Sequence, residues 1–410
     1  MSEQLADNIS LKKKLQKAER RKKIEALGLI SPLFFVMLVF FFIPIALMLY
    51  RSIDNSQMPA ALPQTADIIQ QWSGEGLPDE ATYAAIVGDM RIANEEKKLG
   101  MVGRRLNFDL VGYYSLLSKT GRKIDEIKGP PYKEALINFD KKWGDTRYWT
   151  VMERGLKDKT LLYLLAAMDL KYDENNKIVK VPEYEAIYIS IISRTVYISI
   201  SITILCLILG FPIAYYMANS PPRTRNLLMI ILLLVFWTSL LVRTLSWILV
   251  LQNNGVVNNF LMFSGIINQP LELVFNRFGV YVAMTHVLLP FMVLPLYSVM
   301  RSIPADYVRA ARSLGAKSIT AFIRVYLPQT LPGIGAGALM VFIQALGYYI
   351  TPALVGGPRD QMVSYFVAFF VNERVNWSMA SSLGVVLLIL TGSLYLMFGK
   401  KVNIANMKLG

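Results

Sequence analysis

The chain has few of the side chains that carry out chemistry. Among its 410 residues there is one cysteine, Cys206, and one histidine, His286. A lone cysteine cannot form a disulfide within the chain, and no His-Glu-x-x-His sequence or Cys/His cluster is present to hold a catalytic metal. The sequence therefore predicts a protein that is not an enzyme and holds no cofactor of its own. Cys206 is expected to be an inert apolar residue, and His286 a hydrogen-bonded packing residue rather than a proton relay.

Charged residues are scarce and apolar residues are abundant. Charged side chains make up 18% of the chain and apolar ones 54%, with a mean hydropathy of +0.40. A helix needs roughly 20 mostly apolar residues to cross a bilayer core about 30 Å thick. Six stretches reach or approach that length, so we predict an all-α polytopic membrane protein. The expected spans are 29–50, 187–217, 227–251, 280–300, 333–350 (beginning near Leu327) and 379–398.

Basic residues mark one side of the membrane. They gather before the first span, between the second and third, between the fourth and fifth, and after the sixth. Because basic loops stay in the cytoplasm, both termini are predicted to be cytoplasmic, with tails at 1–28 and 401–410. The residues concerned are Lys12, Lys13, Lys14, Lys17, Arg20, Arg21, Lys22, Lys23, Arg223, Arg225, Arg301, Arg309, Arg312, Lys317, Arg324, Lys400, Lys401 and Lys408.

The formal net charge of +14 does not indicate nucleic-acid binding. Segment 51–186 holds 20 basic and 21 acidic residues, whereas the rest of the chain holds 23 basic and 8 acidic ones. The excess therefore lies mostly on one membrane face, where anionic headgroups attract it. We expect membrane lipid, and no nucleic acid, as its partner.

A cleaved signal peptide is the alternative for the first span. Its apolar stretch runs over 29–50, longer than the 7–15 residues typical of a signal sequence, and no Ala-x-Ala site follows promptly. We therefore expect a retained helix.

Segment 51–186 is much too long for a simple connector between spans. We predict an α-rich periplasmic insertion, either a folded cover for the helix ends or a docking surface for a solute-binding protein. The elements expected in it are an irregular stretch at 54–78, helix over 81–117, a break at 129–131, helices at 132–143 and 147–170, and a short strand at 177–181.

A polar, basic segment, 301–328, separates the fourth and fifth spans. Its sequence places Tyr307, Ala310, Ala311 and Leu314 at helical spacing, so one narrow apolar face is expected. Gly315 then permits a backbone turn that a β-carbon would oppose. An amphipathic helix lying in the headgroups is the alternative interpretation.

The order Ala310-Ala311, three residues, Gly315, nine residues, Val325-x-Leu327-Pro328 resembles the EAA loop of permease subunits of ABC importers. The resemblance implies a short helix that docks on a separate ATPase, which binds the ATP and Mg. Consistent with this, the chain has no Gly-x4-Gly-Lys-Ser/Thr loop of its own. The coupling residues implied are Arg309, Ala310, Ala311, Gly315, Leu327 and Pro328. Arg309 stands where the family usually has Glu, which implies a different, acidic surface on the ATPase.

Segment 187–400 resembles the five-helix permease core of binding-protein-dependent ABC type I importers. Within it, Phe236-Trp237-Thr238-Ser239-x3-Arg243, Asn254-Gly255-x2-Asn258 and Leu354-x-Gly356-Gly357-Pro358 are similar to the spermidine/putrescine branch. The resemblance implies a bacterial inner-membrane subunit with three kinds of partner: a second permease, an ATPase dimer and a periplasmic solute-binding protein. It implies a polyamine as solute. Opine-like, amino-acid-like or other small organic solutes are the alternative.

Arg243 is the leading candidate for the substrate path, because ionisable groups inside a bilayer are costly and tend to mark pathways. Trp237 and Trp247 flank it and offer aromatic faces to a cationic solute, with Thr238, Tyr348 and Tyr349 as further candidates. The alternatives are an Arg243 that snorkels to the interface and tryptophans that face lipid.

No carboxylate lies in the expected spans, which leaves room for a zwitterionic or anionic solute. A secondary transporter should show paired acidic residues at mid-membrane, and a receptor or scaffold would leave the 308–328 pattern unexplained.

Overall fold

The computed structural model describes the backbone of residues 2–402 and the side chains of residues 19, 20 and 22–396. Most of the expected tail at 401–410 and several basic side chains used for the orientation lie outside the described residues. Those side chains are Lys12, Lys13, Lys14, Lys17, Arg21, Lys400, Lys401 and Lys408.

The chain divides at Arg51 into two compact units. The first is helical throughout, with α1 (Ser2–Met37), a π-helical turn (Leu38–Phe42) and α2 (Ile43–Arg51). Its segment Lys22–Arg51 is long and apolar enough to cross a membrane, and none of its most apolar window is buried by protein. A lipid environment is the physical setting in which such a helix is stable, because its backbone groups bond within the segment and its side chains are apolar.

Six helical segments of the described chain have the length and hydropathy of membrane spans, which confirms the predicted number. They are Lys22–Arg51, Tyr188–Asn219, Leu240–Phe263, Arg277–Ser302, Ser318–Leu346 and Trp377–Leu396. The all-α polytopic fold class expected from the sequence is therefore confirmed.

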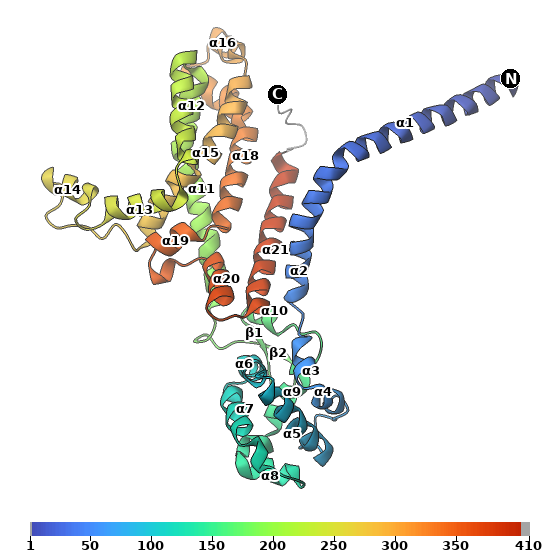
Figure 1. Ribbon diagram of the computed structural model, residues 1–410. Coiled ribbons are helices and arrows are strands. Elements are labelled where there is room, and N and C mark those ends of the chain that lie inside the picture. The colour runs from blue at the N-terminus through green and yellow to red at the C-terminus, as the bar shows by residue number, and fades with distance from the viewer. Residues whose placement is uncertain (1, 403–410) are drawn as a thin grey trace. The chain divides into compact units, whose positions relative to one another are not determined.

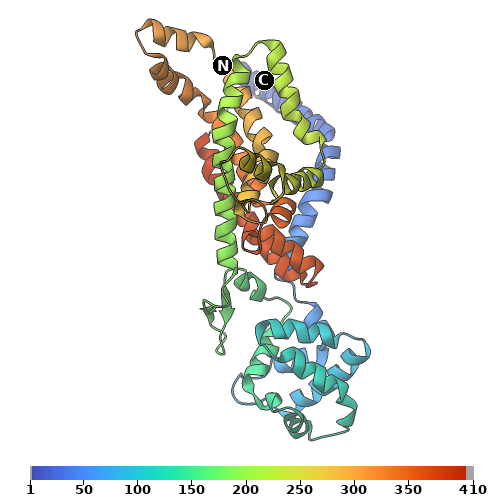
Figure 2. The same ribbon diagram turned by 90° about the vertical axis from the view of Figure 1, so that its left-hand side faces the viewer.

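Three helices form the centre of the second unit: α11 (Tyr188–Asn219), α15 (Arg277–Ser302) and α18 (Leu327–Leu346). α11 and α15 run in the same direction, because the Arg277 guanidinium lies 5.9 Å from the Tyr197 ring at one end and Arg301 Nη1 lies 3.4 Å from the Ala218 carbonyl at the other. Figures 1 and 2 show these helices side by side along most of their length.

α18 runs antiparallel to α15 and contacts it through glycines. A β-carbon at Gly333 would lie 3.0 Å from Val299 Cβ, and one at Gly337 would lie 2.8 Å from Met292 Sδ and 3.0 Å from its carbonyl oxygen. No larger residue fits without moving α15, and small residues are how membrane helices approach closely. The start of α18 at Leu327 and its passage through Pro332 agree with the sequence prediction.

The predicted single helix over 227–251 is wrong. α12 (Pro222–Trp237) ends at an extended pair, Thr238 and Ser239, and α13 (Leu240–Leu251) begins after it. The Thr238 hydroxyl donates to the Val235 carbonyl at 3.2 Å, which satisfies an acceptor that helix continuation would have used. Threonine and serine side chains compete with backbone hydrogen bonding in this way, so a Thr-Ser pair can end a helix without proline or glycine.

The remaining elements of this part follow in chain order. They are α14 (Val256–Phe263), α16 (Ala305–Ser313), α17 (Ser318–Ala321), a π-helical turn (Phe322–Tyr326), α19 (Ile350–Val355), a 3₁₀ turn (Pro358–Asp360), α20 (Val363–Asn372) and α21 (Trp377–Val402).

The insertion is α-rich, as predicted, but its elements differ in detail. The stretch expected to be irregular, 54–78, carries two short helices, and the helices expected at 81–117 and 147–170 are each interrupted. Its elements are α3 (Gln57–Ala61), α4 (Pro63–Ile69), α5 (Glu80–Glu95), α6 (Leu99–Asp109), α7 (Tyr113–Arg122), a 3₁₀ turn (Ile124–Glu126), α8 (Tyr132–Phe139), a 3₁₀ turn (Lys141–Gly144), α9 (Thr146–Gly155), α10 (Leu162–Ala166), β1 (Leu170–Tyr172) and β2 (Ile178–Lys180).

The strand predicted at 177–181 is present as β2, paired antiparallel with β1 so that Leu170 faces Lys180. The partner strand β1 was not expected, because Leu170 ended the predicted helix 147–170 and the next two residues were assigned to no element. A three-residue strand carries too little periodicity to be recognised, and pairing across the turn decides its conformation.

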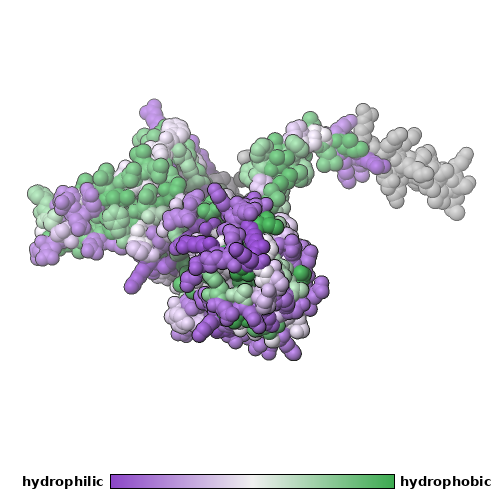
Figure 3. All heavy atoms as spheres, turned by 60° about the horizontal axis from the view of Figure 1, so that its bottom comes forward, coloured by the Kyte–Doolittle hydropathy of each residue, from purple (hydrophilic) through white to green (hydrophobic). Residues whose placement is uncertain are grey.

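The insertion has an aromatic core of the kind found in soluble domains. Tyr83 and Trp149 pack with ring centroids 4.6 Å apart, and Trp143 lies 5.5 Å from Trp149. The Tyr83 hydroxyl donates to the Trp143 carbonyl at 2.6 Å, and burial raises the pKa of Tyr83 to about 12, so it remains a donor at neutral pH. Figure 3 shows a largely hydrophilic outer surface over the insertion and apolar surface on the helices behind it.

Asp169 joins the insertion to α11. Its buried carboxylate accepts hydrogen bonds from three successive backbone amides at the start of that helix, Ile187 (3.1 Å), Tyr188 (3.0 Å) and Ile189 (2.7 Å). These are among the amides that have no partner within the helix, and a negative charge is favoured at this end of a helix. Close by, α10 packs on α11, α20 and α21 through an apolar cluster that includes Tyr163, Ile191 and Met379.

We predict that Asp169→Ala lowers the stability of the protein by about 1–3 kcal/mol, because three amides lose their acceptor. The measurement is thermal unfolding of the full-length protein in detergent. Asp169→Asn should lose less stability, since an amide oxygen still accepts hydrogen bonds and asparagine tolerates the positive φ of 53° at this position.

Glu183→Ala is the control, because Glu183 is an exposed acid on the same connecting segment. An unfolding midpoint in Asp169→Ala no lower than that of Glu183→Ala would show that the cap contributes nothing.

Candidate functional site

The segment 301–328 and the insertion lie at opposite ends of the parallel pair α11 and α15. The insertion leads directly into the start of α11, whereas α16 follows directly from the end of α15. Figure 1 shows α16 at one extreme of this bundle and α3 to α9 beyond the other. If these helices cross a membrane, the two features face opposite sides of it.

A tight turn separates the two short helices of the loop. The Ala316 amide donates to the Ala311 carbonyl at 3.1 Å and the Gly315 amide donates to the Arg312 carbonyl at 3.0 Å, the Schellman arrangement that ends many helices. Gly315 has a φ of +90°, a conformation that glycine adopts without strain. The sequence-based interpretation of Gly315 as a turn residue is confirmed.

The loop carries apolar side chains that nothing in the described chain covers. Leu314 is 89% exposed and Ile319 is 68% exposed, and Tyr307 and Ile323 are also exposed. The six coupling residues implied by the sequence all lie on this loop or where it joins α18: Arg309, Ala310 and Pro328 are exposed, Ala311 and Leu327 are half-buried, and Gly315 is exposed at the turn. An exposed apolar face on an otherwise basic segment is typical of an interaction site.

Arg309 forms an ion pair with Asp306, one turn earlier on α16, at 2.7 Å. Both side chains are more than 70% exposed, so the pair contributes little stability and can be exchanged for partner contacts. The helix therefore presents a carboxylate as well as a guanidinium, although Arg309 occupies the position where the family usually has Glu.

A cavity of about 490 Å³ lies beside the break between α12 and α13, among α12, α13 and α15. Three of the predicted path residues line it: Thr238, Arg243 and Trp247. Ser246 and His286 complete the polar part of its wall, and the remainder is aliphatic. The sequence could place Arg243 in a span, but only the break at Thr238 turns α13 so that Arg243 and Trp247 face a shared space.

One hydrogen bond joins two polar side chains of this cavity from different helices. Trp247 Nε1 donates to His286 Nδ1 at 3.1 Å, and the two rings lie edge to face with centroids 5.6 Å apart. Because Nδ1 accepts, His286 is held as a neutral ring, which agrees with the predicted packing role. Arg243 Nε is buried and has no hydrogen-bond partner among the described residues, so this guanidinium retains an unused donor beside the cavity.

Three predicted path residues lie outside the cavity. Trp237 is 76% exposed at the end of α12, as a lipid-facing tryptophan would be. Tyr348 packs on the core cluster of the bundle, near Arg243. Tyr349 lies against Tyr365 of α20, with centroids 6.3 Å apart, in an aromatic group that sequence reasoning missed.

Close contacts with neighbouring backbone explain why residues 356 and 357 are both glycine. A β-carbon at Gly356 would lie 2.6 Å from the Pro352 carbonyl oxygen, and one at Gly357 would lie 2.7 Å from the Phe275 carbonyl oxygen. Beyond them Asp360 binds Arg277 at 2.9 Å, so this loop is attached to the start of α15. The motif therefore maintains the packing of the helix ends next to the insertion.

The fold and the site together define the class of protein to which this chain belongs. An all-helical membrane protein with a broken span beside a cavity, and with an exposed amphipathic loop at one end of its bundle, is a membrane subunit of a transport system.

Comparison with known proteins identifies the family. Residues 210–407 match the family described as binding-protein-dependent transport system inner membrane component. The spermidine/putrescine transport system permease protein PotB of Escherichia coli is 32% identical over 225 residues, which cover 55% of this chain and 82% of that protein. The chain belongs to this family of inner-membrane, multi-pass permease components.

Two further similarities were found. The inner membrane ABC transporter permease protein YdcU of Escherichia coli is 32% identical over 231 residues, covering 52% of this chain and 71% of that protein. A chain in the crystal structure of a bacterial alginate ABC transporter, complexed with its alginate-bound periplasmic protein, is 18% identical with a TM-score of 0.41, covering 52% of this chain and 77% of that chain. That structural likeness is too weak to support a conclusion.

We predict that Trp247→Phe lowers the initial rate of solute uptake by the assembled transporter about fivefold. The substitution removes the indole donor to His286, worth about 1 kcal/mol, and frees the imidazole to move in the cavity. Uptake is measured in cells or proteoliposomes containing matched amounts of the protein.

Trp237→Phe is the matched control, because the same chemical change is made at a tryptophan outside the cavity. It should stay within about twofold of the parent rate. Equal effects of the two substitutions on uptake would contradict a position of this cavity on the solute path.

Proposed function

We propose that this chain is the permease subunit of an ATP-driven importer. In that assembly it pairs with a second permease subunit, a dimer of ATPases and a periplasmic solute-binding protein, and contributes half of the translocation path. The observation that carries the proposal is the α16–α17 loop. Its apolar residues are uncovered, its turn is built on Gly315, and it lies within the family-matched region.

The proposed orientation places α16, α17 and both termini in the cytoplasm, and the insertion in the periplasm. Two observations support it. Basic residues concentrate on the side that carries the loop, and the loop and the insertion lie at opposite ends of α11 and α15.

The connectivity suggests how docking would move the spans. The loop joins the end of α15 to the start of α18, and these helices are in contact through Gly333 and Gly337. A displacement of α16 by a closing ATPase would therefore move α15 and α18 together. ATP and Mg would be bound by that partner, and this chain supplies no chemistry to the hydrolysis.

A polyamine is the solute we propose, because the PotB relatives are spermidine/putrescine permease proteins. Trp247 can offer an aromatic face to an amine. No carboxylate lines the cavity, so binding there would be weak and transient, and selectivity would reside in the binding protein.

Arg243 favours a second candidate. A guanidinium with an unused donor attracts a carboxylate and repels an ammonium, so an opine or amino-acid derivative is the alternative solute. A secondary transporter is less well supported, since ion coupling would need acidic groups that this cavity does not have.

We predict that Gly315→Asp abolishes coupling between ATP hydrolysis and uptake while the protein still inserts into the membrane. A β-carbon at Gly315 meets nothing within 4 Å, but a φ of +90° is strained for aspartate by about 1–2 kcal/mol, so the turn between α16 and α17 changes. Uptake and ATPase activity are measured together in proteoliposomes.

Gly74→Asp is the matched control. Gly74 also has a positive φ (81°) and open space around its β-carbon, but it lies in the insertion. It imposes the same backbone strain away from the loop. Uptake by Gly315→Asp equal to that of Gly74→Asp would contradict the coupling role.

We predict that labelled putrescine or spermidine accumulates in proteoliposomes containing the whole assembly, and only when ATP is inside. Uptake of an opine or amino acid, with polyamines excluded, would replace the polyamine by the alternative solute and leave the importer function standing. Accumulation driven by an ion gradient without ATP would instead refute the importer function.

A further inference from the structure

The insertion contains a second cavity, distinct from the one beside Arg243. It encloses about 450 Å³, a volume typical of sites for small ligands. It lies between the end of α6, the end of α9 and the segment that leads into α10. Tyr172 and Asn176 of the β-hairpin close another side.

Cationic side chains dominate the wall of this cavity. Arg105, Arg154, Lys157 and Lys159 line it, and Asp109 is the only carboxylate among its lining residues. The excess is local, because segment 51–186 as a whole carries 20 basic and 21 acidic residues. Asp54 lies opposite Lys159 in an isolated antiparallel bridge and Asp158 precedes Lys159 in the chain, but neither carboxylate lines the cavity.

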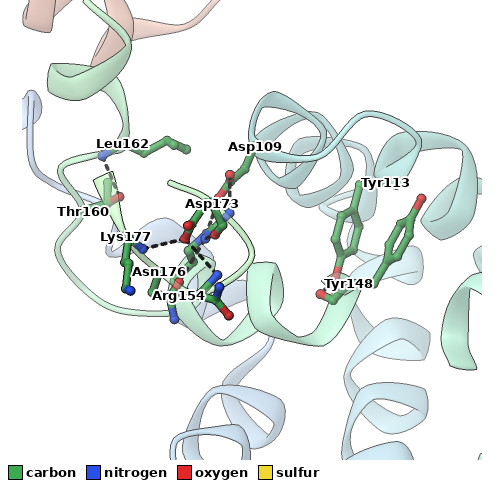
Figure 4. A network of polar contacts seen from close by, with 10 residues as sticks. Asp109, Tyr113, Tyr148, Arg154, Thr160, Leu162, Asp173, Asn176 and Lys177 are labelled. Atoms are coloured by element: carbon green, nitrogen blue, oxygen red, sulfur yellow. Dashed lines mark hydrogen bonds and ion pairs between the residues drawn. The ribbon is translucent and has the colours of Figure 1, made fainter. Parts of the chain in front are cut away.

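Arg154 and Asp109 satisfy one another and leave no free charge. Arg154 Nε and Nη2 donate to the two Asp109 oxygens at 2.7 and 2.6 Å, and the pair is largely buried. Arg154 Nη1 donates to the Asp173 carbonyl (3.1 Å) and to Asn176 Oδ1 (3.0 Å). Figure 4 shows Arg154 reaching toward these three residues. The only acid of the wall is therefore neutralised.

Arg105 is held in place by its neighbours, and one of its N–H donors has no acceptor in the described part of the chain. Its Nε donates to Asn55 Oδ1 at 2.9 Å, and its guanidinium lies 4.0 Å from the Tyr163 ring centroid. Its Nη1 is buried and has no hydrogen-bond partner among the described residues. A buried guanidinium N–H without an acceptor is costly, and such a group calls for an explanation.

Lys159 adds a second positive charge. Lys157 is paired with Glu153 at 2.7 Å, whereas no ion pair of Lys159 occurs within the part of the chain whose side chains are described. Arg105 and Lys159 therefore present two positive charges to one cavity. Guanidinium and ammonium groups placed together in this way are suited to a phosphate or another oxyanion.

One part of the wall is apolar and lies next to the membrane helices. Ile53, Leu106, Leu161 and Leu162 line this part, which suits a ligand that carries an apolar portion. Leu162 begins α10, and Tyr163, on which Arg105 stacks, packs in the cluster that contacts α11, α20 and α21. A headgroup at the membrane surface can reach such a position.

We propose that this cavity binds a phosphate-bearing anion with an apolar portion. An anionic membrane lipid is one source of that chemistry, and a small soluble organic phosphate is the other. Arg105 and Lys159 bind the phosphate oxygens, and the leucine and isoleucine side chains contact the apolar part. The inference rests on the insertion alone and does not depend on the importer function or its solute.

The test uses the full-length protein in detergent, with ligand binding followed by thermal shift and by native mass spectrometry. One arm adds phosphatidylglycerol, with phosphatidylcholine as the neutral-headgroup comparison. The other arm adds butyl phosphate, with inorganic phosphate as the comparison that lacks an apolar portion. We expect phosphatidylglycerol or butyl phosphate to stabilise the protein, and Arg105→Gln/Lys159→Gln to bind about tenfold more weakly or worse.

Arg104→Gln/Lys128→Gln is the matched control, since it removes the same two charges from exposed positions in the insertion outside the cavity. It should bind like the parent. Should the Arg105 variant fail to fold, Lys159→Gln alone is the test, because the Lys159 side chain is exposed and forms no ion pair with the described side chains.

Three results would overturn the proposal. They are no stabilisation in either arm, equal stabilisation by phosphatidylcholine and phosphatidylglycerol with no effect of butyl phosphate, and unchanged affinity in the Lys159 variants. A response only to phosphatidylglycerol identifies lipid as the source, and a response only to butyl phosphate identifies a soluble ligand.

Discussion

The close contact between α15 and α18 is the constraint on which the functional arrangement depends. Gly333 and Gly337 leave no room for a side chain against Val299 and Met292, so the two helices cannot separate or slide without losing that packing. The loop that carries α16 and α17 connects the end of α15 to the start of α18. In the proposed importer, a displacement of the loop would therefore move the two helices together.

The break at Thr238 and Ser239 allows α13 to run in a different direction from α12. That change brings Arg243 and Trp247 toward His286 and opens the cavity between the helices. Breaks of this kind, at the depth of the membrane, are tolerated where the exposed backbone lines a cavity or is packed by protein. The same break places Trp237 at an exposed helix end, so two tryptophans ten residues apart have different environments.

The insertion is stabilised by different physics from the spans. Its core is built from buried aromatic rings with hydrogen-bonded polar atoms, as in a soluble domain, whereas the spans rely on small residues and apolar surface. Asp169 and the α10 cluster connect the two regions. This junction also adjoins the cationic cavity, so a ligand bound there would contact the segment that holds the insertion on α11.

The amino-acid sequence by itself determined the class of protein, the number of spans and the place of the turn at Gly315. These properties depend on local quantities: the length of apolar runs, the position of basic residues, and the freedom of Gly315 to adopt a positive φ. The sequence also identified Arg243 as an ionisable residue inside an expected membrane span. Only the tertiary structure decided which side chains meet. The pairing of Trp247 with His286, the cap that Asp169 gives to α11, and the approach of Arg105 and Lys159 to one cavity all join residues far apart in the chain. No periodicity or propensity records such contacts, because they arise from the packing of whole helices.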